Sequence, residues 1–244
     1  MIKKLLILLL LCSPVFGQWK NGIKPMLGRQ IDWSHPLARG LVGCWLMNEG
    51  GGTIVNDLSG NGNTGIIYDL AETSWISGMY GPAIRFNGEN NSYIIVASNG
   101  TISLFPELTV VYCFKDTIDL SAQVTTQFYI TDSLTTQLRV RTNDLSDTSW
   151  LWNVGVDVRD GNWRTICAAY DGAAMKGYID GVYNDEEAKT GTIALTGLSF
   201  DMGRSPYGNS VGDVSHCFLY NRALSASKIA YLYRSPFCMF EVDL

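Results

Sequence analysis

The chain has 244 residues, of which 17% are charged, and its 18 basic and 23 acidic side chains leave a net charge of −5. This mild acidity, without any basic run, excludes a nucleic-acid-binding surface, which requires clustered lysine and arginine. The length suits either one large all-β domain or two small ones, and a single domain of this size buries enough surface to fold without disulfides.

Residues 1–17 have the pattern of a secretory signal peptide. Two lysines precede the apolar run Leu5–Leu11, and Gly17 supplies a small residue for cleavage. The run is too short to span a bilayer, which takes about 20 apolar residues. Cys12 is a candidate lipid anchor, but a large leucine precedes it where such signals have a small residue. We therefore predict a cleaved leader, no membrane span, and a secreted or cell-surface protein.

The chain after the leader divides into an arm and a domain. Residues 18–39 show no clear element, and we expect an arm laid across the domain. Residues 40–244 form one predicted domain, because no linker or repeat divides them. Within it, short β-branched or aromatic runs alternate with Gly, Asn and Asp, which is typical of a β-sandwich. The runs are Leu41–Met47, Thr64–Tyr68, Ala83–Phe86, Tyr93–Val96, Leu108–Phe114, Thr126–Thr131, Gln137–Arg141, Trp150–Val158, Thr165–Tyr170, Lys176–Ile179, Leu198–Met202 and Val214–Tyr220.

Two turn signals and one helix signal complete the predicted elements. Asp-Gly pairs at residues 171–172 and 180–181 separate three strand-like runs, so residues 163–184 are predicted to form an antiparallel meander. Ser225 is a natural N-cap for a helix over residues 226–234, and Pro236 ends it.

Five cysteines follow the leader, at wide and irregular spacing: Cys44, Cys113, Cys167, Cys217 and Cys238. An odd number so spaced does not indicate a disulfide framework. The first four lie in apolar runs and are predicted to be buried thiols. One or two bridges are the alternative in an oxidising compartment.

Seven phrases follow one another in order: Gly40–Trp45, Asn48–Gly52, Asp57–Gly65, Gly81–Gly88, Trp163 with Ala169–Gly172, Gly177–Val182 and Gly212–Ser225. Together they resemble the laminin G-like jelly-roll family of the concanavalin A-like superfamily. The sequence departs from the family pattern at Asn87, where Asp is usual, and at His216 and Cys217, where Arg and Ile are common. The resemblance implies an all-β, antiparallel two-sheet jelly-roll sandwich with one short C-terminal helix. It also implies binding of glycans, proteins or cell surfaces, often with a structural calcium.

The third phrase alternates oxygen-bearing side chains with glycines, which suits a calcium ion with six to eight oxygen ligands. Asp57, Asn61 and Asn63 are the candidate ligands, and the family resemblance adds Asp213. The segment is not an EF-hand, because Tyr68 stands at the twelfth position. Its glycine spacing is not a dinucleotide fingerprint either, because a strand and not a helix follows. A plain Asx-rich turn is an equal alternative to the calcium site.

No catalytic set is apparent in the sequence. Neither Asp185–Glu187, in a predicted turn, nor Glu241 with Asp243 supplies the carboxylate pair of a glycosidase. Ser210 has the spacing of a nucleophile elbow, but a strand follows it where an elbow needs a helix. We therefore predict a binding module and not an enzyme.

Sugar recognition uses aromatic faces beside amide and guanidinium groups. The candidates are Trp75, Trp150, Trp152, Arg204 and Tyr207, each with core or rim packing as its alternative. The leading hypothesis is a lectin-like, carbohydrate-binding module that takes a glycan or a surface protein. A self-associating structural subunit of a surface layer, fibre or virion is the alternative, because the apolar tail Pro236–Phe240 would be costly to expose. A glycoside hydrolase is a third.

Overall fold

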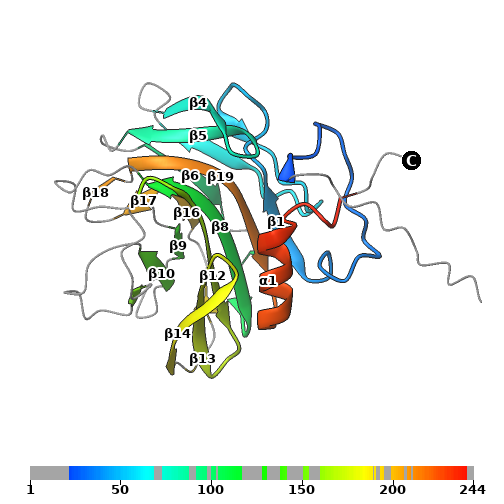
Figure 1. Ribbon diagram of the computed structural model, residues 1–244, viewed down its shortest axis with the longest axis vertical. Coiled ribbons are helices and arrows are strands. Elements are labelled where there is room, and N and C mark those ends of the chain that lie inside the picture. Colours follow the sequence, from blue (N-terminus) through cyan, green and yellow to red (C-terminus); the bar gives the residue numbers. More distant parts are fainter. Residues whose placement is uncertain are drawn as a thin grey trace, which may run out of the picture.

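The computed structural model describes residues 22–68, 73–87, 92–97, 100–102, 104–116, 128–130, 138–141, 151–153, 160–188, 190, 193–194, 199–205, 208–209 and 211–240. The predicted leader lies outside these residues. Within them the chain forms two large β-sheets, two small two-stranded sheets and one helix (Figure 1).

The larger sheet has eight strands and is antiparallel throughout. Its order is β14 (Val182–Ala188), β13 (Ala174–Ile179), β12 (Trp163–Tyr170), β8 (Leu108–Asp116), β19 (Val211–Tyr220), β5 (Gly81–Asn87) and β4 (Thr73–Gly78), with β1 (Leu41–Trp45) also paired to β19. The turns at Asp171 and Asp180 join β12, β13 and β14, which confirms the predicted meander. Asp180 has a φ of 49°, a conformation that Asp tolerates better than most residues.

The second sheet has seven strands. Its order is β11 (Leu151–Asn153), β10 (Leu138–Arg141), β9 (Phe128–Ile130), β16 (Ser199–Met202), β6 (Tyr93–Ala97), β3 (Gly65–Tyr68) and β2 (Ile54–Val55). Its strands pair antiparallel except β10 and β11, which run parallel. The small sheets pair β7 (Leu104–Phe105) with β15 (Ile193–Ala194), and β17 (Arg204–Ser205) with β18 (Gly208–Asn209). Side chains of β9, β10, β11, β15, β17 and β18 are not among those described.

The first hydrophobic core lies between the two large sheets. Alternation along each strand sends every second side chain into it, as in β3, where Gly65 and Ile67 are buried and Ile66 and Tyr68 are exposed. Trp45 lies at its centre and stacks on Phe200 with ring centroids 5.3 Å apart. The predicted two-sheet sandwich is confirmed. Trp163, at the start of β12, is partly exposed.

A second hydrophobic core covers the outer face of the eight-stranded sheet. Helix α1 (Ala226–Arg234), at the predicted residues, packs there through Ile229 and Leu232 (Figure 1). The N-terminal arm, here residues 22–39, adds Ile31 and Leu37, and the tail adds Phe237. Because both faces of the sheet are covered, β19 is buried along almost its whole length.

The tail is therefore packed in this second core and is not an exposed apolar surface. Phe237, Met239 and Phe240 are all buried. Ile31 forms a β-bridge with Phe240, and the Asp32 N–H donates to the Met239 carbonyl at 2.8 Å, so the arm and the tail hold each other. The tail gives no support to the assembly-subunit hypothesis.

The five cysteines that follow the predicted leader are free thiols. Cys44, Cys113, Cys167 and Cys217 are buried, as predicted, and Cys238 is partly buried. Burial raises the pKa of each of these thiols.

Candidate functional site

The predicted calcium loop is organised by the Asp57 carboxylate. Its Oδ1 accepts hydrogen bonds from the backbone N–H groups of Cys44 and Ser59, both at 2.9 Å. Its Oδ2 accepts from the Ser59 hydroxyl at 2.8 Å and from the Asn63 N–H at 2.9 Å. One carboxylate therefore satisfies four donors and ties the loop to β1, as an Asx-rich turn does.

The two asparagines of the loop are also turned toward the protein. The Asn63 amide donates to the Val42 carbonyl at 2.6 Å, and its Oδ1 accepts from the Thr101 hydroxyl at 3.1 Å. The Asn61 amide donates to the Ser59 hydroxyl at 3.0 Å. Trp45 adds to this network, because its indole N–H donates to the Asn63 carbonyl at 2.7 Å. The loop thus closes over one end of the first core.

Asp213 lies apart from this loop. It is buried on β19 and forms two hydrogen bonds with the Arg85 guanidinium of β5, at 2.6 and 2.9 Å. Asp57 bridges to Trp45, whose partner on β19 is Cys217. Asp213 is four residues from Cys217, or roughly 13 Å along the strand, which is too far for one cation to bind both carboxylates at 2.3–2.6 Å.

The four predicted calcium ligands therefore do not form one site. Asp57, Asn61 and Asn63 lie together but serve as hydrogen-bond partners of their own loop, and Asp213 is neutralised by Arg85. Within the described part of the chain, no three His, Cys, Asp or Glu side chains gather closely enough to hold a metal ion. The arrangement fits a metal-free turn better than a calcium centre, and calcium binding at the loop stays a prediction.

Among the five predicted sugar-contacting residues, the structure describes the side chain of Trp75 alone. Trp75 of β4 packs against the first core, and its indole N–H donates to the Gly52 carbonyl at 3.0 Å. Trp152 lies in β11 and Arg204 in β17, where only the backbone is described. Trp150 and Tyr207 lie outside the described residues. The roles of these four stay predictions.

A different aromatic surface lies on the outer face of the seven-stranded sheet. Tyr68 of β3 and Tyr93 of β6 are cross-strand partners, and their rings stack with centroids 5.0 Å apart and planes 9° apart. Tyr68 is 47% exposed and Tyr93 is 8% exposed, so the nearly buried ring of Tyr93 supports the half-exposed ring of Tyr68. We refer to these two residues as the tyrosine pair.

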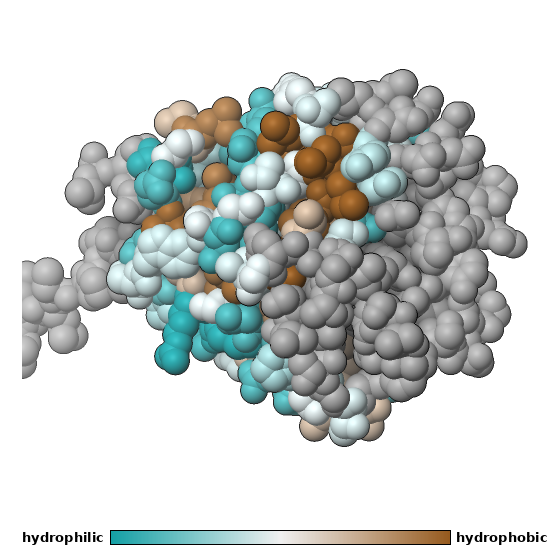
Figure 2. Space-filling model, turned by 180° about the vertical axis from the view of Figure 1, so that it is seen from behind, coloured by the Kyte–Doolittle hydropathy of each residue, from teal (hydrophilic) through white to brown (hydrophobic). Residues whose placement is uncertain are grey.

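Aliphatic side chains extend this surface across the sheet. Ile54 of β2 pairs with Ile66 of β3, and Ile66 pairs with Ile95 of β6. Ile54 and Ile66 are each about half exposed, and Ile95 is partly exposed. The next partner in the row is Asp201 of β16, which is buried. Figure 2 shows the side of the molecule away from α1, where apolar side chains gather near the top of the view.

Sequence reasoning missed this surface, although a signal for it was present. Residues 66–68 and 93–96 are apolar or aromatic at every position. A strand that faces water on one side normally alternates apolar and polar residues. When every residue of a strand is apolar although one face of its sheet is open, the exposed apolar residues indicate a binding surface.

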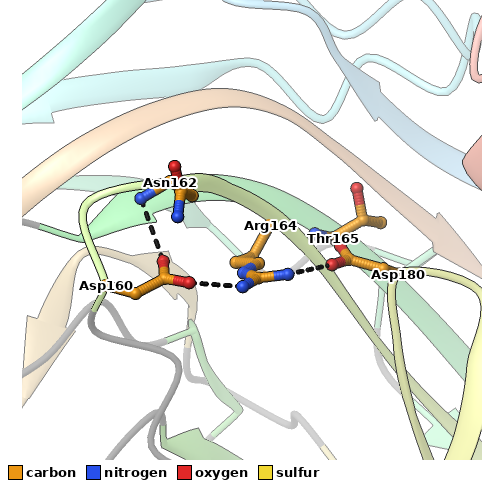
Figure 3. Close-up of polar contacts among 5 residues, drawn as sticks. All are labelled: Asp160, Asn162, Arg164, Thr165 and Asp180. Carbon is orange, nitrogen blue, oxygen red and sulfur yellow. Dashed lines mark hydrogen bonds and ion pairs between the residues drawn. The ribbon is translucent and has the colours of Figure 1, made fainter.

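The strongest cluster of charged side chains lies elsewhere, at the start of β12 (Figure 3). Arg164 contacts the Asp160 carboxylate and, at 2.7 Å, the Asp180 carboxylate, which also accepts from the Thr165 N–H at 2.9 Å. The hydrogen bond from Arg164 lowers the pKa of Asp160. Both acids are thus occupied by one arginine that closes the turn before β14. This is not the open carboxylate pair that glycoside hydrolysis requires.

A family model described as the concanavalin A-like lectin/glucanases superfamily matches residues 86–230, more than half of the chain. The chain belongs to this superfamily. The match begins in β5 and ends in α1, so it includes most of the sandwich. A search of curated proteins finds no significant match.

Solved structures share this concanavalin A-like fold. Domain 4 of AbnA, an extracellular arabinanase of Geobacillus stearothermophilus, was solved with arabinotriose. It has a TM-score of 0.65 and 20% identity, over 79% of this chain and 98% of that one. The binding domain of Paraclostridial mosquitocidal protein 1 has a TM-score of 0.60 and 18% identity, over 82% and 53%. The botulinum neurotoxin serotype D binding domain, solved with N-acetylneuraminic acid, has a TM-score of 0.57 and 13% identity, over 81% of this chain and 51% of that one.

This concanavalin A-like chain spans about half the length of the toxin binding domains that it matches. It corresponds in length to the arabinanase domain instead. In the part of the chain that the structure describes, no helix combines the length and the apolar character needed to cross a membrane.

Proposed function

We propose that the chain is a carbohydrate-binding module, secreted or displayed on a surface, whose sugar platform is the tyrosine pair. The observation that carries the proposal is the exposed ring of Tyr68 stacked on the nearly buried ring of Tyr93. A pyranose or furanose presents a C–H face that packs on an aromatic ring, and an immobilised ring loses little conformational entropy when it binds.

The surroundings of the tyrosine pair suit an oligosaccharide better than a single sugar. The row of Ile54, Ile66 and Ile95 continues the apolar surface across three strands. Adjacent strands lie about 4.8 Å apart, so this row, which runs beside the tyrosine pair, spans roughly 10 Å. The match to a lectin and glucanase superfamily supports the same proposal. Two of the similar solved structures contain a bound sugar, which supports it further.

The test is a comparison of two tyrosines that occupy similar positions in different sheets. Tyr183 of β14 is 50% exposed and packs edge-on against the buried Tyr178, so it is a matched control for Tyr68. Arabinotriose and a sialylated trisaccharide serve as first probes, followed by a glycan array. Binding is measured by isothermal titration calorimetry or by ligand-observed NMR.

We expect Tyr68→Ala to weaken glycan binding by at least about tenfold, or ~1.4 kcal/mol, because a supported aromatic ring is a typical binding hot spot. Tyr183→Ala should bind as the wild type does. Equal affinity of Tyr68→Ala and wild type for a glycan that the wild type binds would contradict the proposed platform. The absence of binding to any glycan on the array would contradict the proposed function.

A structural subunit is the second candidate function. The observation that favours it is the half-exposed pair Ile54 and Ile66, and not the tail, which is buried. The same strip would serve as an interface between copies of this chain. Sedimentation velocity separates the two functions. A monomer that binds glycan supports the first, whereas regular oligomers that Ile66→Glu dissociates support the second.

A further inference from the structure

One edge of β19 is shared by two strands that leave a gap between them. β5 pairs with residues 211–214 and β1 pairs with residues 217–220, so neither pairs with Ser215 or His216. A bulge in the pairing of β19 with β8 falls at the same place. Ser215 and His216 are buried, so main-chain groups at the gap need partners other than solvent.

Lys24 of the N-terminal arm fills this gap. Its Nζ donates to the Ser215 carbonyl on β19 at 2.7 Å and also to the Pro82 carbonyl on β5. Its backbone N–H donates to the Tyr80 carbonyl at 2.9 Å, so the residue is held at both ends. Lys24 is only 5% exposed, which is unusual for lysine. The side chain joins β5 to β19 where the strands themselves do not pair.

The groups around Lys24 are aromatic or neutral for the most part. His216 packs edge-on against Tyr80 and Phe237, with ring centroids 5.6 and 5.1 Å away. Cys113 faces the gap from β8, where burial raises the pKa of its thiol to about 12. Burial also raises the pKa of Tyr80, so both groups are uncharged near neutral pH.

The charge of Lys24 is costly in this environment. Burial lowers the pKa of Lys24 to about 7, and Cys113 and Glu49 act weakly in the opposite direction. Burial, and then the charge on Lys24, hold the pKa of His216 well below its usual value. Asp180, at the turn after β13, acts on Cys113 and Tyr80. In the closed form His216 therefore stays neutral, and a proton taken up near the gap is held by Lys24 at the cost of its burial.

We propose that Lys24 is a pH-sensitive latch, which fastens the N-terminal arm across the gap between β5 and β1 in mildly alkaline solution and loosens as the pH falls through neutrality. Release lifts the start of the arm and opens the cluster of Tyr80, His216 and Phe237 to water. The latch lies on the eight-stranded sheet, on the opposite side of the sandwich from the tyrosine pair. The proposal is therefore independent of the proposed function.

Proton linkage sets the size of the effect. In the open arm, Lys24 has the ordinary lysine pKa of about 10.4, so the open form binds a proton more tightly than the closed form. With a closed-form pKa of about 7, the opening equilibrium constant rises roughly tenfold between about pH 8 and pH 5.5. Protonation of His216 in the open form adds to this rise.

The experiment is hydrogen exchange of the full chain at these two pH values, followed by mass spectrometry and corrected for intrinsic exchange rates. Peptides from residues 22–30 report on the arm, and peptides from α1 serve as the internal reference. We expect protection of the arm to fall about tenfold at the lower pH relative to α1. Arm protection that follows α1 at both pH values would overturn the proposal.

Two variants and one control assign the effect to Lys24. Lys24→Gln keeps a hydrogen-bond donor but does not titrate, and Lys24→Met removes both properties. In both variants the pH dependence of arm protection should shrink severalfold. Lys228→Gln on α1 should keep the full wild-type dependence. Full dependence in Lys24→Gln would overturn the proposal.

A measurement on the wild type stands even if neither Lys24 variant folds. NMR titration of lysine side chains should show one residue with a midpoint near 7. A set in which every midpoint lies above about 9.5 would overturn the proposal.

Discussion

Arg85 and Asp213 join β5 to β19 through two hydrogen bonds between a half-exposed guanidinium and a buried carboxylate. We expect Arg85→Ala to lower the free energy of unfolding by about 2 kcal/mol, because it leaves the buried charge of Asp213 without a partner. Arg85→Ala with Asp213→Asn should recover part of this loss. Urea denaturation measures both, and a stability of Arg85→Ala within about 0.5 kcal/mol of wild type would show that the pair is not stabilising.

A substitution at Asp57 tests whether its loop is a metal site or a metal-free, hydrogen-bonded turn. Asp57→Ala leaves the N–H groups of Cys44, Ser59 and Asn63 without their acceptor, so we expect a loss of about 3 kcal/mol. The loss should be the same in calcium and in chelator, because these donors do not depend on a metal. Melting curves in the two buffers check this. A loss seen only in calcium would establish the calcium site that the sequence pattern suggested.

The tail contributes to stability through Phe237. We expect Phe237→Ala to cost about 3–5 kcal/mol, because it leaves a cavity in the second core beside His216. Trp33→Ala, at a side chain of the arm that is 55% exposed, is the control and should cost less than about 1 kcal/mol. Denaturant unfolding of the two variants gives the comparison. Similar losses in both would mean that the tail does not pack as described.

His216 should make the fold sensitive to acid. Its pKa in the folded protein lies well below the usual value, so the unfolded chain binds the proton more tightly and stability falls as the pH drops below about 6.5. His216→Phe should flatten the stability curve in this window. His35→Gln is the control, because His35 is only half-buried and Asp32 offsets part of the burial effect on its pKa. Unfolding midpoints measured across this pH range report the difference, and equal slopes in His216→Phe and wild type would refute the assignment.

The sequence was sufficient for the sandwich because short strands, turns and helix caps are local signals. Asp171 and Asp180 each follow directly after the last residue of a strand. Ser225 precedes α1, and Pro236 follows it. Pairing over long distance carries no such local signal. The ion pair of Asp213 with Arg85 depends on the register of two strands, and the two residues are 128 positions apart. The prediction that Asp213 lies beside Asp57 therefore rested on the family resemblance alone.

The site was predicted less well for a related reason. The sequence does not distinguish an exposed aromatic residue from one in the core, because the difference depends on which face of the sheet the side chain occupies. Trp75 is a candidate in the sequence because aromatic faces recognise sugars, but its side chain packs against the first core. Tyr68 was overlooked because its strand is apolar on both faces and therefore has the pattern of a buried strand.

The position of β19 in the chain has a consequence for biosynthesis. Its partners β1, β5 and β8 all precede it by about a hundred residues or more, and it holds the three together. Until residues 211–220 leave the ribosome, each partner exposes an unsatisfied strand edge, so the eight-stranded sheet cannot close while residues 1–210 are being synthesised. Such late, long-range pairing slows folding and leaves time for aggregation. We expect a nascent chain of this protein to depend on a chaperone until residues 211–220 have emerged.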